Sequence, residues 1–273
     1  MTPRLPVLIA RHAVLVAFAV VFLTPFAGIV LAAFQDGAGA GGFALPEHWT
    51  LDNFAEAWEQ GHFADLIRSS LIIAVLVVPA TIVLSTLAGF GLAVLRPAGH
   101  RRITGAFVAG LTLPTELVVI ALYYNLDGVG LTNNYLGIAL AEIALFLPFG
   151  VFWMHTHFST VPRELVEAGR IDGAGDLRVL KDLLLPISIP ATTTLAVLFF
   201  VWAWNQFLIV LVLMQSPGRR TATAGLGYFV GEFSTDVPLL SAASLIVIAP
   251  VVVVYLIFQR SFVNGITQGA IKG

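Results

Sequence analysis

Apolar residues gather into six long runs that are separated by short polar segments. Each run has 19 to 25 residues, and an α-helix of about 20 residues crosses the roughly 30 Å hydrocarbon core of a bilayer. A transmembrane β-barrel would instead show short alternating segments. The pattern therefore predicts an all-α polytopic membrane protein with six transmembrane helices in a single domain over residues 1–273. The expected spans are 13–34, 71–95, 104–124, 136–154, 192–213 and 239–258.

Composition agrees with this pattern and removes several classes of protein. Hydrophobic residues make up 58% of the 273 residues and charged residues 11%, against about 25% charged residues in soluble domains. So few charges exclude a water-soluble enzyme and a disordered chain. The net charge of −2 makes nucleic acid an unsuitable partner. The absence of cysteine excludes a disulfide scaffold and a thiol nucleophile.

The basic residues predict the orientation of the spans. Six spans place both termini on the same side of the membrane, and Lys and Arg concentrate on the cytoplasmic side. Eleven of the 14 basic residues lie on the side that holds the termini, so both termini are expected to be cytoplasmic. These eleven are Arg4, Arg11, Arg96, Arg101, Arg102, Arg163, Arg170, Arg178, Lys181, Arg260 and Lys272, and the other three are Arg68, Arg219 and Arg220.

The longest predicted cytoplasmic loop, residues 159–190, has the pattern of a short amphipathic helix, a turn and a second amphipathic piece. Pro162 suits the first turn of a helix, and Gly173 is a suitable residue at which to end it. Pro186 ends the second piece. A helix lying flat on the membrane surface would show the same pattern. The apolar stripe of the first helix consists of Val161, Leu165, Ala168 and Ile171.

This loop resembles the EAA motif of ABC-importer permeases: Glu-Ala-Ala, three residues, Gly, nine residues, Ile, one residue, Leu-Pro. Every spacing is kept, while Gly169 replaces the second alanine and Leu183 replaces the isoleucine. By this resemblance the loop is a coupling helix with its return segment. The residues implied to couple the chain to an ATPase are Glu167, Ala168, Gly169, Asp172, Gly173, Ala174, Leu183 and Pro186.

Three further segments look like carbohydrate-uptake permeases of the maltose type. They read WTLDNF at 49–54, WNQF at 204–207 and GITQGAIKG at 265–273. Gln206 departs from that subfamily, in which the position is often acidic. The resemblance extends along nearly the whole chain.

The resemblance implies a machine of several subunits in the bacterial cytoplasmic (inner) membrane. This chain would form half of a translocation pathway for a di- or oligosaccharide, surrounded by membrane lipid. Its implied partners are a second homologous permease, a cytoplasmic ABC ATPase dimer and an extracellular or periplasmic solute-binding protein. ATP and Mg would be bound by the ATPase, because this chain has no G-x-x-x-x-G-K-[ST] sequence. No catalytic residue, cofactor or metal site is expected in this chain.

Polar side chains within the spans are candidates for the substrate pathway. The alternatives are an aromatic belt for the tyrosines and an interhelical hydrogen bond for Asn205. Three of the candidates, at 202, 205 and 206, are expected to share one helical face. The candidates are Tyr123, Tyr124, Asn125, Trp202, Asn205, Gln206 and Glu116.

Two other functions remain open at this point. The same architecture could import glycerol phosphate or another polar solute. A cation-coupled transporter would need an acid within a span as carrier, and Glu142 is the best candidate. Glu116 and Glu142 could each face the translocation cavity or pair with the partner subunit.

Overall fold

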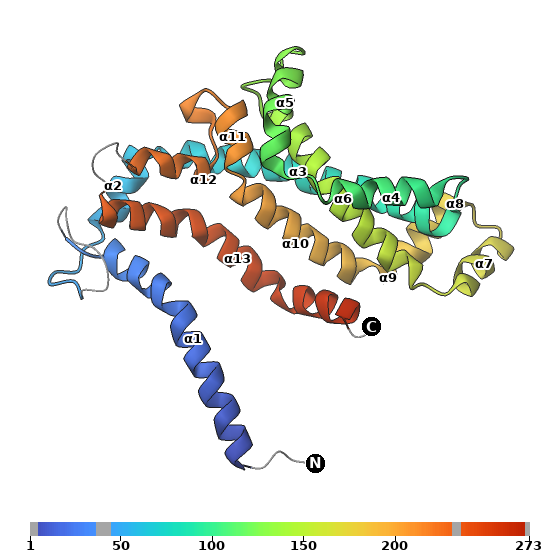
Figure 1. The fold of residues 1–273 in the computed structure, drawn as a ribbon, viewed down its shortest axis with the longest axis horizontal. Helices are drawn as coiled ribbons and strands as arrows, with labels where there is room; N and C mark the ends of the chain where they lie inside the picture. Colours follow the sequence, from blue (N-terminus) through green and yellow to red (C-terminus); the bar gives the residue numbers. More distant parts are fainter. Residues whose placement is uncertain (1–4, 37–44, 231–235, 271–273) are drawn as a thin grey trace. The chain divides into compact units, whose positions relative to one another are not determined.

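A computed structural model describes residues 5–36, 45–230 and 236–270, and the side chains of 8–36, 45–230 and 236–259 (Figure 1). Within these residues the regular structure is helical and contains no β-strand, apart from isolated bridge residues such as the pair Gln35 and Trp49. The all-α prediction is confirmed. Two of the basic residues used to predict orientation, Arg4 and Lys272, lie outside the described residues.

The helices range from single turns to long rods, and two segments are π-helical. The long ones are α1 (Leu5–Ala33), α3 (Phe63–Phe90), α6 (Tyr135–Ser159), α10 (Ile189–Asn205) and α13 (Val237–Ala270). The shorter ones are α2 (Asp52–Gln60), α4 (His100–Gly110), α5 (Thr115–Asp127), α7 (Arg163–Ile171), α8 (Asp176–Arg178), α9 (Leu185–Ile187), α11 (Leu208–Leu213) and α12 (Ala222–Gly225). The π-helical segments are η1 (Gly91–Leu95) and η2 (Val179–Leu184), and the 3₁₀ turns are η3 (Pro217–Arg219) and η4 (Leu226–Phe229).

Four continuous segments are long and apolar enough to cross a membrane. They correspond to the first, second, fourth and sixth predicted spans. The other two predicted spans are not single straight helices. The count reaches six only if each of two bent helix pairs is one span: His100–Gly110 with Thr115–Asp127, and Asp176–Ile187 with Ile189–Asn205, which are bent by 79°. The four segments are Leu8–Ala33, Phe63–Leu95, Tyr135–Ser159 and Val237–Gln259.

The third predicted span, 104–124, is wrong as a single helix. α4 ends at Gly110, α5 begins at Thr115, and the two helices are bent by 101°. Pro114 has no backbone N–H to donate, and it disfavours the α conformation of the residue before it. Glu116, expected inside the span, lies exposed in the first turn of α5, where a carboxylate is favoured by the helix dipole.

The fifth predicted span, 192–213, is also interrupted. α10 ends at Asn205, Gln206 is extended with ψ 115°, and α11 begins at Leu208. Side chains supply donors to the last carbonyls of α10: Asn205 Nδ2 donates to Val201 O at 2.9 Å, and Thr223 Oγ1 donates to Trp204 O at 2.7 Å. Such side-chain bonds compete with the backbone ladder of a helix. Gln206 therefore does not share a helical face with residues 202 and 205.

The chain divides into two compact units. The first comprises Met1–Ala64 with Gly225–Pro250, and the second comprises Asp65–Ala224 with Val251–Gly273. All candidate coupling and substrate residues belong to the second unit. In the first unit, the rings of Phe63 and Phe229 stack with centroids 6.1 Å apart.

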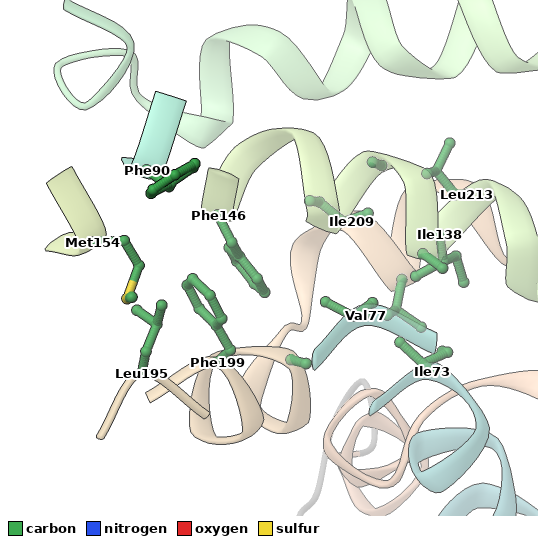
Figure 2. Packing of buried hydrophobic residues seen from close by; sticks show 14 of the residues in the cluster. Ile73, Val77, Phe90, Ile138, Phe146, Met154, Leu195, Phe199, Ile209 and Leu213 are labelled. Carbon is green, nitrogen blue, oxygen red and sulfur yellow. The ribbon is translucent and has the colours of Figure 1, made fainter. Parts of the chain in front are cut away.

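The core of the second unit is built around α6, which contacts α4, α5, α10, α11 and η1. Figure 2 shows buried apolar side chains from α3, α6, α10 and α11 that point toward one another. Glycines allow α3 and α6 to approach closely: a Cβ on Gly89 would lie 2.7 Å from Met154 Cβ, and one on Gly150 would overlap Ser85. Small residues at helix contacts are the usual means of packing helices in membranes.

Asn133 joins the loop before α6 to the loop after α11. Its backbone is left-handed, with φ 53°, a conformation that Asn tolerates better than most residues. Its N–H donates to Leu213 O at 2.8 Å, and its Nδ2 donates to Ser216 Oγ at 2.8 Å. Ser216 N–H donates back to Asn133 Oδ1 at 3.0 Å. One side chain thus fixes the positions of both loops.

We predict that Asn133→Ala destabilises the chain by about 2–3 kcal/mol, because two part-buried hydrogen bonds are lost and alanine is strained in the left-handed region. The matched control is Asn134→Ala, which removes the helix cap in which Leu136 N–H donates to Asn134 Oδ1. This change should lower the free energy of unfolding by about 1 kcal/mol. Thermal unfolding of the purified protein in detergent measures both. An equal or larger effect of Asn134→Ala would contradict the bridging role of Asn133.

Candidate functional site

The loop between α6 and α10 forms a helix, a tight turn and a return segment, as the sequence predicted. α7 is followed by the turn 172–175, then α8, η2 and α9. In Figure 1 this segment lies at the end of α6 that is remote from α5 and α11. α7 contacts η2, so the return segment packs back on the helix.

A paired set of backbone hydrogen bonds closes the C-terminus of α7. Ala174 N–H donates to Gly169 O at 2.9 Å, and Gly173 N–H donates to Arg170 O at 3.0 Å. Together these bonds form a Schellman motif, which needs a left-handed residue after the helix. Gly173 provides it, with φ 81°. No atom lies within 4 Å of the position that a Cβ would take at Gly173, so the requirement for glycine there is conformational and not steric.

An ion pair crosses the same turn. Arg170 Nη2 lies 2.8 Å from Asp176 Oδ1, and both side chains are about half exposed. An exposed pair of this kind contributes little to stability. It nevertheless joins the last turn of α7 to the start of α8. This contact is not evident from the motif, although the two charges stand six residues apart on either side of the predicted turn.

The two departures from the EAA pattern touch each other. A Cβ on Gly169 would lie 2.5 Å from Leu183 Cδ1 and 3.6 Å from Val179 Cγ2. Gly169 is buried and Leu183 is half-buried. The side chain of Leu183 therefore occupies the space that an alanine at 169 would need. The two substitutions compensate for each other in packing, which the linear motif does not reveal.

The apolar stripe predicted for α7 is largely exposed. Ile171 has 86% of its surface exposed and Leu165 37%, while the buried positions of the helix are Val166 and Gly169. Uncovered apolar side chains on a short charged helix are typical of a surface that contacts another protein or the membrane. Of the remaining predicted coupling residues, Glu167, Ala168, Asp172 and Pro186 are exposed and Ala174 is half-buried.

The candidate substrate residues fall into two groups on neighbouring helices. Tyr123, Tyr124 and Asn125 lie in α5, which contacts α11. Gln215, just after α11, donates from Nε2 to the Tyr123 hydroxyl at 3.2 Å. Tyr124 has 71% of its surface exposed. The second group lies at the end of α10, at the helix break that directly precedes α11.

At the break between α10 and α11, polar side chains lie next to non-helical backbone. Asn205 is exposed, and Gln206 is half-buried in the extended link between α10 and α11. In a segment that crosses a membrane, non-helical backbone is tolerated where it is buried in protein or lines a water-filled cavity. Trp202 has a different environment, because it packs against the rings of Phe149 at 4.9 Å and Phe146 at 5.5 Å. It therefore contributes to the core.

Glu142 is fully buried in α6, and neither of its carboxylate oxygens has a hydrogen-bond partner among the described residues. It does not face an open cavity in this structure. Glu116 is exposed, as described above, so the two acids expected inside spans have opposite environments.

Comparison with known proteins gives a consistent result. Residues 81–268 match the model of the family described as binding-protein-dependent transport system inner membrane component. The chain is 30% identical over 265 residues to the diacetylchitobiose uptake system permease protein NgcG of Streptomyces coelicolor, covering 96% of this chain and 88% of that protein. It is 31% identical over 264 residues to the trehalose/maltose transport system permease protein MalG of Thermococcus litoralis, covering 94% of each.

Another relative is also named as an import permease, and a solved structure has the same fold. The melibiose/raffinose/stachyose import permease protein MelC of Bacillus subtilis is 29% identical over 231 residues, covering 84% of this chain and 83% of that protein. The crystal structure of a bacterial ABC transporter involved in the import of the acidic polysaccharide alginate superposes with a TM-score of 0.83. It covers 96% of this chain and 99% of the matched chain at 20% identity. At this identity the likeness shows the fold.

The contact between Gly169 and Leu183 leads to a prediction about stability. Gly169→Val should cost about 1–3 kcal/mol, because its side chain overfills the space held by Leu183. In a Leu183→Ala background the same change should cost much less, since the space is then empty. Thermal unfolding in detergent of the unaltered protein, the two single variants and the double variant forms a double-mutant cycle. Identical costs in the two backgrounds would show that positions 169 and 183 are not packed together.

Proposed function

Because this chain belongs to the family of binding-protein-dependent transport system inner membrane components, we propose that it is the permease subunit of an ATP-binding-cassette importer for a di- or oligosaccharide. The sugar class is supported by relatives of nearly equal length that are named for sugar uptake. In this proposal the chain forms half of the translocation pathway, and a second homologous permease forms the other half. A solute-binding protein on the outer side delivers the sugar.

The orientation proposed has six spans and both termini in the cytoplasm. The four continuous segments supply four of the spans, α4 with α5 supplies another, and α10 provides the helical part of the sixth. The distribution of Lys and Arg supports a cytoplasmic position for the loop that contains α7. The membrane is the bacterial inner membrane, in agreement with the family description.

Coupling to a cytoplasmic ATPase dimer is supported by the exposed face of α7. The Schellman motif and the contact of Gly169 with Leu183 hold α7 against its return segment. A segment held in this way transmits displacement as a rigid body. Leu165, Ala168 and Ile171 provide the surface for the ATPase. ATP and Mg are bound and ATP is hydrolysed by the ATPase, so this chain acts as a transport subunit and not as an enzyme.

Sugar contact is assigned to the break between α10 and α11. Discontinuous helices near the membrane midplane form the substrate sites of many transporters. Asn205 and Gln206 supply amide groups there, and an amide both donates to and accepts from a sugar hydroxyl. Tyr123, Tyr124 and Asn125 on α5 extend the polar surface beside α11. Trp202 supports this region from the aromatic cluster.

Reconstitution of the complete transporter into liposomes tests the cargo. We expect ATP-dependent uptake of at least one di- or oligosaccharide in the presence of the binding protein, with no dependence on a proton gradient. Glu142→Gln should retain this uptake, because the amide is close in size to the carboxyl group that it replaces in a fully buried position. Uptake of glycerol 3-phosphate but of no sugar in the panel would contradict the proposed cargo. Gradient-driven uptake abolished by Glu142→Gln would favour a cation-coupled transporter.

The turn after α7 provides a test of coupling. Gly173→Val should lower ATP-driven uptake by about 5–30-fold, because a left-handed β-branched residue costs about 1–2 kcal/mol, while the protein still inserts. The matched control is Gly175→Val. Gly175 has φ −71°, and its Cβ position is equally open, so uptake should be retained. Full uptake by Gly173→Val, or an equal loss in both variants, would contradict the coupling role of the capped turn.

A further inference from the structure

A cavity of about 240 Å³ lies between α7, the C-terminal end of α6 and η1. All of these elements belong to the second unit. The wall of the cavity includes apolar side chains such as Val94, Leu95 and Phe158. Its charged residues are Arg96, Arg163, Arg170 and Glu167. Three cations and one anion line the cavity, and the ion pair of Arg170 with Asp176 reduces their net charge from +2 to +1; the rest of the wall is apolar apart from Ser159.

The cavity lies at the ends of two candidate membrane spans. The apolar segment Phe63–Leu95 ends in its wall, and so does Tyr135–Ser159. The cavity therefore lies at one end of two of the segments that are apolar enough to cross a membrane. Leu95 has 41% of its surface exposed, which leaves an apolar surface next to the charged residues.

Arg96 is held in place by an unusual backbone. It has φ 51°, in the left-handed region that non-glycine residues seldom adopt. Its N–H donates to Gly91 O at 2.9 Å, and its Nε donates to Ala93 O at 2.8 Å. A left-handed residue commonly closes a helix, and Arg96 closes the C-terminus of η1 in this way, which fixes where its side chain leaves the backbone. The guanidinium group has further N–H donors beyond the one used by Ala93.

Two of the three arginines have no anionic partner in the described part of the chain. Arg170 is paired with Asp176. For Arg96 and Arg163, no carboxylate of the described residues lies within ion-pair distance. They belong to different elements, since Arg96 follows η1 and Arg163 begins α7. A single anion between them would connect α7 to the end of the second span.

We infer that this cavity binds the headgroup of an anionic phospholipid. Its phosphodiester lies between Arg96 and Arg163, and its acyl chains leave the cavity along the apolar surface at Leu95. Arginine is well suited to phosphate because of its planar fork of donors. A soluble phosphate ester would use the same arginines but would have no apolar part to place against Leu95. This site goes beyond the proposed transport function and does not depend on the identity of the cargo.

The test uses the complete transporter in nanodiscs of phosphatidylcholine with a minor fraction of phosphatidylglycerol. Native mass spectrometry measures the affinity for phosphatidylglycerol. Arg96→Gln/Arg163→Gln should lower that affinity by roughly 25-fold, about fivefold for each arginine near the membrane surface. The control Arg101→Gln/Arg102→Gln removes the same charge from exposed positions of α4 that do not line the cavity, and it should bind as the unaltered protein does.

Several outcomes would overturn the inference. Unchanged affinity in the cavity variant, or an equal loss in the control, would mean that the arginines attract lipid without a site. Displacement of the bound lipid by inorganic phosphate alone would identify a soluble anion as the ligand. Release of the ATPase from the cavity variant, with lipid affinity retained, would identify the cavity as a protein contact. None of these measurements uses sugar uptake, so failure of the proposed cargo leaves their interpretation unchanged.

Discussion

The structure depends on one constraint: a bilayer offers no hydrogen bonds, so every backbone group at membrane depth must be satisfied by the chain itself. Long helices meet this requirement in α1, α3, α6 and α13. Where α10 stops, a side chain replaces part of the backbone ladder, because Thr223 donates to the carbonyl of Trp204 in the last turn of the helix. At the break proposed to contact sugar, Thr223 Oγ1 and Gln206 N–H satisfy two of the carbonyls that the end of α10 leaves free, those of Trp204 and Ala203.

Hydropathy predicted the spans that are continuous helices and missed the two interruptions. An apolar run has the same mean hydropathy whether it is straight or bent, so 104–124 and 192–213 looked continuous. Proline did not resolve the question, because Pro79 and Pro148 lie inside unbroken helices while Pro114 separates two. The local sequence therefore does not distinguish a proline that a helix accommodates from one that separates two helices.

For the coupling segment, the sequence predicted where the helix ends but not how the segment packs. Gly173 predicted the end of α7, because a helix followed by a left-handed residue favours glycine. The packing of Gly169 on Leu183 was not predictable from the motif, since the two residues are 14 positions apart and each looked like an isolated departure. The role of Arg96 was equally hidden, because neither its left-handed backbone nor its place in the cavity wall follows from its position after an apolar run.

The packing of Gly169 against Leu183 also bears on how such permeases diverge. Leu183 Cδ1 stands where a Cβ at 169 would lie, whereas the EAA pattern combines alanine at the first position with isoleucine at the second, so the branching of the residue at 183 bears on which residue 169 can be. Exchange of the coupling segment between two related chains is therefore expected to be tolerated best when residues 163–186 move together, because the nine-residue helix alone would arrive without the return segment that packs on it.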